Sequence, residues 1–339
     1  MSLFRRTAPV TYEDLVRVRT RGSSIDTPVS STEAMRSSVI WAGLHLRASL
    51  VSLMPVDVYR KLPDGRRVEV APPQVLVSPD EFAEGKPIRI GQWLYASEMS
   101  LGGWGNAWGI KHSLAETGLP ARIELVQAKD VWLRVKGTRV AEYRFGGETI
   151  DPKYVWHERR HLLPGVPVGM SSIMYAAMSI NTGVAARRFV GDWFQHGAIP
   201  SAWFKKTDKV VSPDASAAIK AKFEETLKAG DMLVTGSDWE YTAIQAKAIE
   251  SGFLDAMGAS DRDLCRYVGV PGDMIDVGVD GSAITYANIT QRNLQLLTIN
   301  MGPDIKDHED ALSALTSKPR FVKLNRSAVL AMDPKSRAE

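Results

Sequence analysis

One long loop between two predicted helices constrains this chain more than any other feature of its sequence. Apolar side chains recur near the helical period in residues 251–270 and again in residues 289–315. Those positions are Phe253, Met257, Leu264 and Val268 in the first segment, and Leu294, Leu297, Met301, Ile305, Leu312 and Leu315 in the second. Between them, residues 271–288 contain three glycines, three aspartates and no Lys or Arg. Connections between helices are usually short, and an irregular one of this length is either functional or disordered. We therefore expect the loop to project from two long helices into a space such as a pore or a groove.

The second helical segment contains a sequence signal for a kink. Gly302-Pro303 lies inside its apolar stripe, and a proline there removes a backbone donor and clashes with the preceding turn. We expect the helix to bend at this point. His308 falls on the same apolar stripe, which favours a hydrogen-bonded histidine of the core or of an interface.

Composition excludes several classes of protein. With 339 residues and 44% hydrophobic content, the chain can bury a sizeable core in two or more domains. The single Cys265 allows no intramolecular disulfide, suits a reducing compartment, and lies on the apolar side of its helix as a core residue. We see neither a secretory signal nor an apolar run of the ~18 residues that a membrane span needs. A net charge of +3 is weak for a protein that holds nucleic acid, so any such contact should be loose.

The first half of the chain predicts helices outside a mainly antiparallel sheet, which is an α+β class. Residues 1–30 are polar and carry several arginines, as expected of a peripheral arm. Ser31 or Thr32 is the expected N-cap of a helix that ends near Leu53. We expect a second helix over residues 90–101 and strands at 55–59, 67–70, 107–111, 123–126, 131–135, 142–145 and 154–157.

The second half predicts a small module between two long helices. After Pro164-Gly165-Val166-Pro167, a helix of roughly 25 residues is expected from Ser171 to His196, well above the usual ~11–12. An insertion then contains predicted strands at 202–205, 232–235 and 240–244 and a helix that begins at Ser212-Pro213. The chain thus leaves its main body on one helix and returns on another.

One motif points to metal chemistry. His157, Glu158 and His161 match H-E-x-x-H, in which two histidines on one helical face bind zinc and the glutamate acts as general base. The preceding residues 154–156 favour a strand, on which positions four apart lie ~13 Å from each other, too far to share one ion. We therefore expect no catalytic residue, metal or cofactor, and keep a zinc-dependent hydrolase as the alternative.

A series of landmarks resembles the HK97-type family of phage portal proteins. Val39 to Tyr59 is similar to the family's first wing helix and strand, and Ser78-Pro79 resembles its "hPN" turn with Asp80 in place of Asn. The further landmarks are Gly105-Asn106-Ala107-Trp108, Val155-Trp156-His157 followed by Gly169-Met170-Ser171-Ser172-Ile173, Val268 to Ile275, and Tyr286 to Gln291.

The resemblance implies a ring, usually of twelve copies, at one vertex of a virion capsid, assembled in the host cytoplasm. Such a ring nucleates head assembly with the major capsid or scaffold protein, docks the terminase motor and later the head–tail adaptor, and passes double-stranded DNA. It is not an enzyme and contacts no membrane. The remaining alternative is an oligomeric scaffold or adaptor that forms no channel.

The resemblance also divides the chain into parts. It implies an N-terminal arm at 1–30, a wing at 31–168, stem helices at 169–197 and 249–270, a clip at 198–248, and a tunnel loop at 271–287. A kinked helix at 288–316 and a wing return strand with the C-terminal tail at 317–339 complete it, and the family's helical crown is expected to be absent or truncated.

Specific residues follow from this division. The channel would be lined by the loop residues Asp276, Val277, Gly278, Val279, Asp280, Gly281 and Ser282. Their lack of cations would repel phosphates over the ~8 Å screening length, so that DNA slides without being held. For Arg187 and Arg188 in the stem the alternatives are a contact with a partner or DNA, a solvated face of the helix, or an ion pair between subunits. The clip would present Trp203, Lys205, Lys206 and Trp239 to partners.

Overall fold

The computed structural model describes most of the chain in two compact units. The described residues are 10–11, 31–177, 179–181, 183, 202–206, 212–214, 216–219, 221, 239–243, 247–277 and 286–330. One unit comprises Met1–Ile180 with Arg262–Glu339, and the other comprises Asn181–Asp261. In the described part of the chain, no helix is long and apolar enough to cross a membrane.

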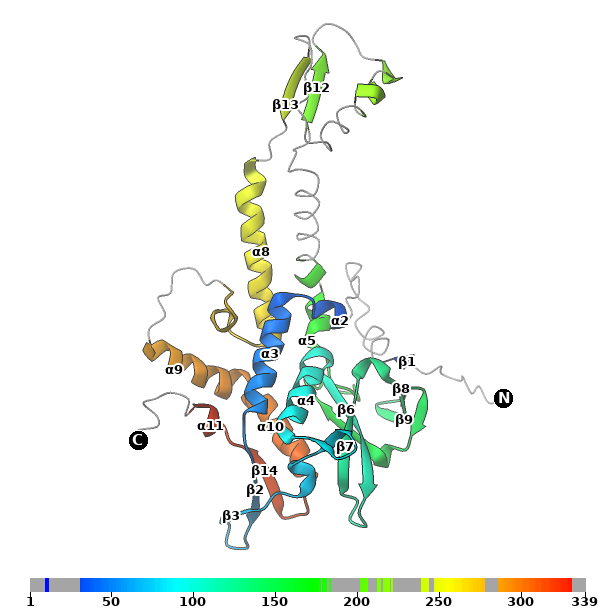
Figure 1. The fold of residues 1–339 in the computed structure, drawn as a ribbon, viewed down its shortest axis with the longest axis vertical. Helices are drawn as coiled ribbons and strands as arrows, with labels where there is room; N and C mark the ends of the chain where they lie inside the picture. The colour runs from blue at the N-terminus through cyan, green and yellow to red at the C-terminus, as the bar shows by residue number, and fades with distance from the viewer. Residues whose placement is uncertain are drawn as a thin grey trace, which may run out of the picture. The chain divides into compact units, whose positions relative to one another are not determined.

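Two helices of equal length pack side by side at the centre of the larger unit (Figure 1). They are α3 (Ser38–Ser52) and α4 (Ile90–Trp104), and each follows an N-cap residue with extended backbone. The helix predicted over residues 31–53 was wrong in one respect, because a short α2 (Ser31–Ala34) precedes α3 and the chain turns between them. Ser37 is the N-cap of α3, and the Ser31 hydroxyl donates to the Gly103 carbonyl (2.8 Å), which fixes α2 against the end of α4. Helix α4 extends three residues beyond the predicted Leu101.

Small antiparallel sheets surround these helices. The predicted single sheet was wrong, because the strands of this unit divide into separate sheets of orders β14-β2-β3, β11-β6-β7, β1-β8-β9-β10 and β4-β5. Their bounds are β1 (Val10–Thr11), β2 (Val56–Lys61), β3 (Arg67–Val70), β4 (Asp80–Ala83), β5 (Lys86–Ile88), β6 (Asn106–Leu114), β7 (Pro120–Val126), β8 (Val131–Lys136), β9 (Arg139–Phe145), β10 (Glu148–Ile150), β11 (Val155–Arg159) and β14 (Arg320–Leu324). The seven strands predicted in the first half are present as β2, β3, β6, β7, β8, β9 and β11, whereas β4, β5 and β10 were not predicted.

Residues 10–11 and 320–324, from opposite halves of the sequence, join these sheets. Val10 and Thr11 pair with Leu133 and Trp132 of β8, so the predicted arm is not wholly peripheral. The return strand predicted within residues 317–339 is present as β14, which pairs with β2 and ends at Leu324. Asn325 is the reason, because its side-chain oxygen accepts from the Ser327 backbone N–H (3.1 Å) and starts the short helix α11 (Ser327–Leu330).

The helices that flank the predicted loop are present. Helix α8 (Lys247–Val268) precedes it and is followed by one 3₁₀ turn, η4 (Gly272–Ile275). Helix α9 (Tyr286–Gln295) follows the loop, continues as a π-helical segment η5 (Leu296–Asn300), and is succeeded by α10 (Gly302–Ser313). The axis is thus interrupted at Met301, directly before Gly302-Pro303, where the sequence predicts a kink.

The stem region and the smaller unit are described only in part. Ser171 is the N-cap of α5 (Ser172–Tyr175), which begins where the long helix was predicted, and most of that helix lies outside the described residues. In the smaller unit, the strands predicted at 202–205 and 240–244 are present as β12 (Ala202–Lys206) and β13 (Trp239–Ala243), which pair antiparallel, and Pro213-Asp214 is helical as expected. The predicted strand at 232–235 lies outside the described residues.

The larger core lies between the two central helices, the β14-β2-β3 sheet and the C-terminal helices. Its buried side chains include Trp93, Leu94, Leu297, Met301 and Ile305, and Trp93 meets Trp156 edge-on at 4.9 Å. A second core lies over β8 and β11 around Trp108 and Leu133. Of the predicted apolar stripe, Leu297, Met301, Ile305, Leu312 and Leu315 belong to this core together with residues of the first hundred, which fixes α10 to the body of the unit, whereas Leu294 is 51% exposed.

Gly105 ends α4 and has no room for a side chain. Its φ is +70°, and a Cβ atom built there would lie 2.4 Å from the backbone of Met170. We predict that Gly105→Ala lowers the free energy of unfolding by about 2–5 kcal/mol, because backbone strain adds to the clash. Urea denaturation followed by tryptophan fluorescence measures this.

Gly65 provides the matched control. Its φ is +86°, but nothing lies within 4 Å of its added Cβ. Gly65→Ala should therefore lose only the strain of about 1–2 kcal/mol. Equal losses for the two variants would contradict the role given to the contact between Gly105 and Met170.

Candidate functional site

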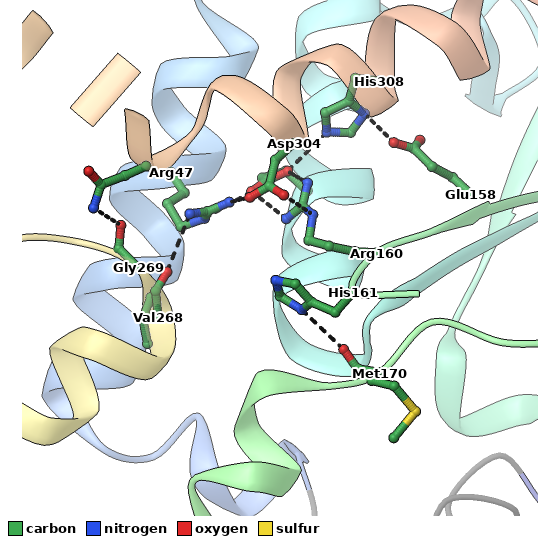
Figure 2. Close-up of polar contacts among 11 residues, drawn as sticks. Arg47, Glu158, Arg160, His161, Met170, Val268, Gly269, Asp304 and His308 are labelled. Carbon is green, nitrogen blue, oxygen red and sulfur yellow. Dashed lines mark hydrogen bonds and ion pairs between the residues drawn. The ribbon is translucent and has the colours of Figure 1, made fainter. Parts of the chain in front are cut away.

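Six ionisable side chains gather inside the larger unit, from elements that are distant in sequence (Figure 2). They are Arg47 of α3, Glu98 of α4, Glu158 of β11, Arg160 just after β11, and Asp304 and His308 of α10, and we call them the ionic cluster. Arg47, Glu98, Glu158, Arg160 and His308 are each at most 5% exposed. Burial of a charge is costly unless it is paired, so their partners determine whether this arrangement is stable.

Glu98 is the centre of the ionic cluster. Arg160 donates to both of its oxygens, from Nη1 to Oε1 (2.9 Å) and from Nη2 to Oε2 (2.6 Å), in a bidentate pair. Arg47 donates from Nε to Oε1 (3.1 Å), and His308 Nε2 lies 2.9 Å from Oε2. Burial opposes ionisation of this carboxyl, but Arg160 and Arg47 outweigh it and hold the pKa of Glu98 well below its usual range. Glu98 is therefore an anion.

His308 is a cation by geometry. Its Nε2 faces Glu98, and its Nδ1 lies 2.9 Å from Glu158 Oε1, so each ring nitrogen faces a carboxylate. A neutral imidazole has a single N–H and can donate to only one of them, whereas imidazolium donates to both. Burial alone would lower the pKa of His308, but Glu158 and Glu98 raise it to about 9. With His308 charged, the cluster contains three cations and three anions.

Asp304 completes the balance between the arginines. It pairs with Arg47 Nη2, and its Oδ1 lies 3.2 Å from Arg160 Nε. Both arginines therefore connect α10 to the α3 and α4 pair through carboxylates on either side. Asp304 thus ties α10 to α3 through Arg47 and to the segment after β11 through Arg160.

The ionic cluster also holds the end of α8. Arg47 Nη1 donates to the carbonyl of Val268 (3.3 Å; Figure 2), and Asn300 Nδ2 donates to the carbonyl of Gly269 (3.1 Å). The last carbonyls of a helix lack intrahelical partners and carry partial negative charge, so a buried arginine is a favourable partner. The predicted loop therefore starts from a point that is fixed to α3.

The three residues of the H-E-x-x-H match do not converge. His157 Nε2 donates to Asn106 Oδ1 (2.9 Å) and its ring stacks on Trp108, and burial lowers the pKa of His157 to about 3. Glu158 faces His308, and His161 contacts the Met170 carbonyl (3.3 Å; Figure 2). The strand predicted here is present as β11, whereas the zinc motif requires a helix at this position. Among the described residues, no group of three or more His, Cys, Asp or Glu could hold a metal ion.

Few of the predicted channel and partner residues fall within the described structure. Asp276 has left-handed backbone (φ 56°) at the end of η4, and the Val277 N–H donates to the Gly272 carbonyl (2.9 Å). Trp203, Lys205 and Lys206 lie in β12, where Lys206 is opposite Trp239 of β13. The predicted residues outside the described ones are Gly278, Val279, Asp280, Gly281 and Ser282 of the loop and Arg187 and Arg188 of the stem. Asp273 of η4 pairs with Arg292 of α9 (3.5 Å), which joins the two ends of the loop to each other.

Sequence reasoning found His308 as a core histidine but missed the other members of the ionic cluster. A signal was available, because Arg47 is the only charged residue between Ser38 and Ser52 and Glu98 the only one between Ile90 and Trp104. A single charge in an apolar helix indicates a buried partner of opposite sign. The identity of that partner depended on the tertiary fold.

We predict that Glu98→Gln lowers the free energy of unfolding by about 3–5 kcal/mol, because three buried cations would then face two anions. Chemical denaturation of the full chain measures this. Glu81→Gln is the control, since Glu81 is 46% exposed and lies 3.8 Å from Arg122, and about 0.5 kcal/mol or less is expected. A loss below about 1 kcal/mol for Glu98→Gln would show that the cluster does not depend on this carboxylate.

The charge of His308 predicts a pH dependence. Because its pKa in the folded chain is about 9, its contribution is complete below pH 6.5 and disappears as the pH rises through 9. The chain should lose of the order of 3 kcal/mol between pH 7 and 10, and His308→Gln should be less stable at pH 7 with a flatter profile. His45→Gln, at an exposed histidine, should keep the wild-type profile. Parallel profiles for the wild type and His308→Gln would contradict this assignment.

Comparison with known proteins agrees with this architecture. The chain is 23% identical over 335 residues to a probable portal protein of Streptomyces phage phiC31, which covers 92% of this chain and 71% of that protein. It is 21% identical over 294 residues to the portal protein of Enterobacteria phage HK97, and this alignment covers 85% of this chain and 68% of that protein.

Solved structures show the same fold. The crystal structure of an HK97 family phage portal protein from Corynebacterium diphtheriae superposes with a TM-score of 0.66 at 18% identity, covering 89% of this chain and 97% of that one. A subunit from the neck of a native gene transfer agent particle, computed with C12 symmetry, gives 0.62 at 15% identity over 95% and 93%. The sequence model of the phage portal protein family matches residues 38–339, and this chain therefore belongs to that family.

Proposed function

We propose that copies of this chain form a ring at one vertex of a phage capsid, and that double-stranded DNA passes through the ring. Membership of the portal family over residues 38–339 supports this most strongly. The likeness of the fold to a subunit of a neck with C12 symmetry favours twelve copies. The ring would belong to the virion and would assemble in the host cytoplasm.

The loop after α8 is the element that we assign to the channel. It starts at a helix end that Arg47 and Asn300 hold, and the Asp273–Arg292 pair joins its two ends. Residues 271–287 contain no Lys or Arg, so the loop would guide a phosphate backbone without binding it. A binding surface would trap DNA, whereas a conduit must release it.

We assign the neighbouring roles by the same division of the chain. Residues 31–168 and the return strand β14 would form the wing, and 169–197 with 249–270 the stem. Residues 198–248, which contain β12 and β13, would form the clip that docks the terminase motor and then the head–tail adaptor. The major capsid or scaffold protein would contact the assembled ring. The protein would act as a structural component and not as an enzyme, with the work of DNA movement supplied by the motor.

Deletion of residues 276–282 tests the loop assignment. The ionic cluster and the Asp273–Arg292 pair lie outside the deleted segment, so rings should still form while DNA packaging or retention falls. Negative-stain imaging measures the rings, and nuclease-protected DNA in particles assembled with the variant measures packaging. Normal packaging with this deletion would refute the assignment.

A charge variant of full length separates loop length from loop charge. With Asp276→Lys and Asp280→Lys, rings should form, and packaging should slow at low salt and recover as salt is raised, because the added cations hold phosphates. Packaging that is equally slow at every salt concentration would contradict the proposed role of the loop's charge. A chain that stays monomeric with its capsid or scaffold protein would contradict the ring itself.

A further inference from the structure

The positive charge of this chain is concentrated at one end of the β14-β2-β3 sheet. Residues 60–69 and 318–320, which are some 250 positions apart, meet there because β14 pairs with β2, beside the β2–β3 hairpin in Figure 1. They contain six cations and two carboxylates, a net charge of +4, whereas the whole chain carries +3. The rest of the chain therefore has a net charge of −1. We call Arg60, Lys61, Arg66, Arg67, Lys318 and Arg320 the basic tip.

The basic tip is exposed and largely unneutralised. All six side chains belong to exposed residues. Arg66 pairs with Asp64 (2.7 Å), while the other five have no ion-pair partner among the described residues. Arg67 instead lies over the ring of Tyr59, at 5.3 Å from its centroid. Five cations are thus available to an outside partner.

The strand register places like charges directly opposite each other. Arg60 pairs with Arg320 across β2 and β14, and Lys61 pairs with Arg67 across β2 and β3. Directly opposite cations repel each other and weaken strand pairing. A polyanion bound at the tip would neutralise these cations and relieve the repulsion. The like charges do not stabilise the sheet itself, so an outside partner is the reason we give for them.

The two pairs point to opposite faces of the sheet. Arg60 and Arg320 each lie two residues from a buried valine, Val58 or Val322, and so share the inner face, while Lys61 and Arg67 lie on the outer one. Cations on both faces suit an extended polyanion better than a single acidic helix on one face. Four of the six are arginines, whose planar fork binds phosphate oxygens in pairs.

We propose that the basic tip binds the phosphate backbone of double-stranded DNA, as a contact surface separate from the loop at 271–287. The choice of DNA as the polyanion rests on the proposed function. Contacts to phosphates carry no sequence information, so binding is independent of sequence. With about four phosphate contacts, binding is weak at physiological salt and falls steeply as salt rises.

This surface also accounts for the charge of the chain as a whole. From the sequence, a net charge of +3 without a basic stripe indicated only loose contact with nucleic acid. The basic stripe exists, but two distant segments build it, and the acidic residues elsewhere conceal it in the total. A net charge near zero and a local DNA-binding surface are therefore compatible.

Duplex binding as a function of salt tests the proposal. Fluorescence anisotropy of the full chain with a labelled 30-bp duplex gives the slope of log K against log salt. The variant Arg60→Gln, Lys61→Gln, Arg67→Gln and Arg320→Gln should reduce the size of that slope by about 3–4, at ~0.9 per lost phosphate contact. Raising salt from 50 to 200 mM should then weaken the wild type roughly a hundredfold more than the variant.

A matched control removes four exposed cations elsewhere, with Lys86→Gln, Lys129→Gln, Lys136→Gln and Arg139→Gln. For this control, the slope of log K against log salt should differ from the wild-type slope by about 1 or less. Equal slopes for the tip variant and the wild type, or an equal loss in the control, would overturn the proposal. Tighter binding of a poly-glutamate peptide than of the duplex would also overturn it, in favour of an acidic protein partner.

Ring imaging of the tip variant separates this proposal from the proposed function. If the variant forms normal rings and its slope is unchanged, DNA binding by the basic tip is rejected and the portal assignment still holds. Rings that form normally with the reduced slope would support both.

Discussion

The buried carboxylate of Glu98 is the constraint on which the rest of the larger unit depends. Its two oxygens accept from Arg160 and Arg47 and face His308, and those three residues come from three different elements. A carboxylate this deeply buried is stable only when cations pair with it, and Arg160, Arg47 and the protonated His308 supply them. The ionic cluster therefore fixes α3, α4, β11 and α10 relative to one another, beyond what apolar packing alone would specify.

The same cluster anchors two of the C-terminal helices. Asp304 and His308 hold α10 and Arg47 holds the end of α8, whereas the Asp273–Arg292 pair joins α9 to η4. Between α9 and α10 lies η5, where the Met301 N–H donates to the Leu296 carbonyl five residues earlier (2.8 Å) and Ile299 is 69% exposed. Such π-helical turns are frequent at functional sites.

The sequence predicted the elements that depend on local pattern. The period of the apolar residues predicted α8 and α10, Gly302-Pro303 predicted the interruption, and strand signals predicted β2 and β3. The landmark series indicated the family, which the match over residues 38–339 confirms. The break between α2 and α3, and the division of the strands among several sheets, depend on distant partners such as Gly103 and were not predicted. The ionic cluster and the basic tip were missed for the same reason, since ordinary charged residues meet there across roughly 260 positions of sequence.

The most direct test of the portal assignment is a three-dimensional reconstruction of the assembled full-length chain by electron cryomicroscopy. We predict a closed ring, with α8 near its axis and residues 271–287 on the inner wall of a channel wide enough for duplex DNA. The ionic cluster should keep its pairing in every subunit. A reconstruction with residues 271–287 on the outer surface, or with no continuous channel, would contradict the assignment of this chain as a DNA channel.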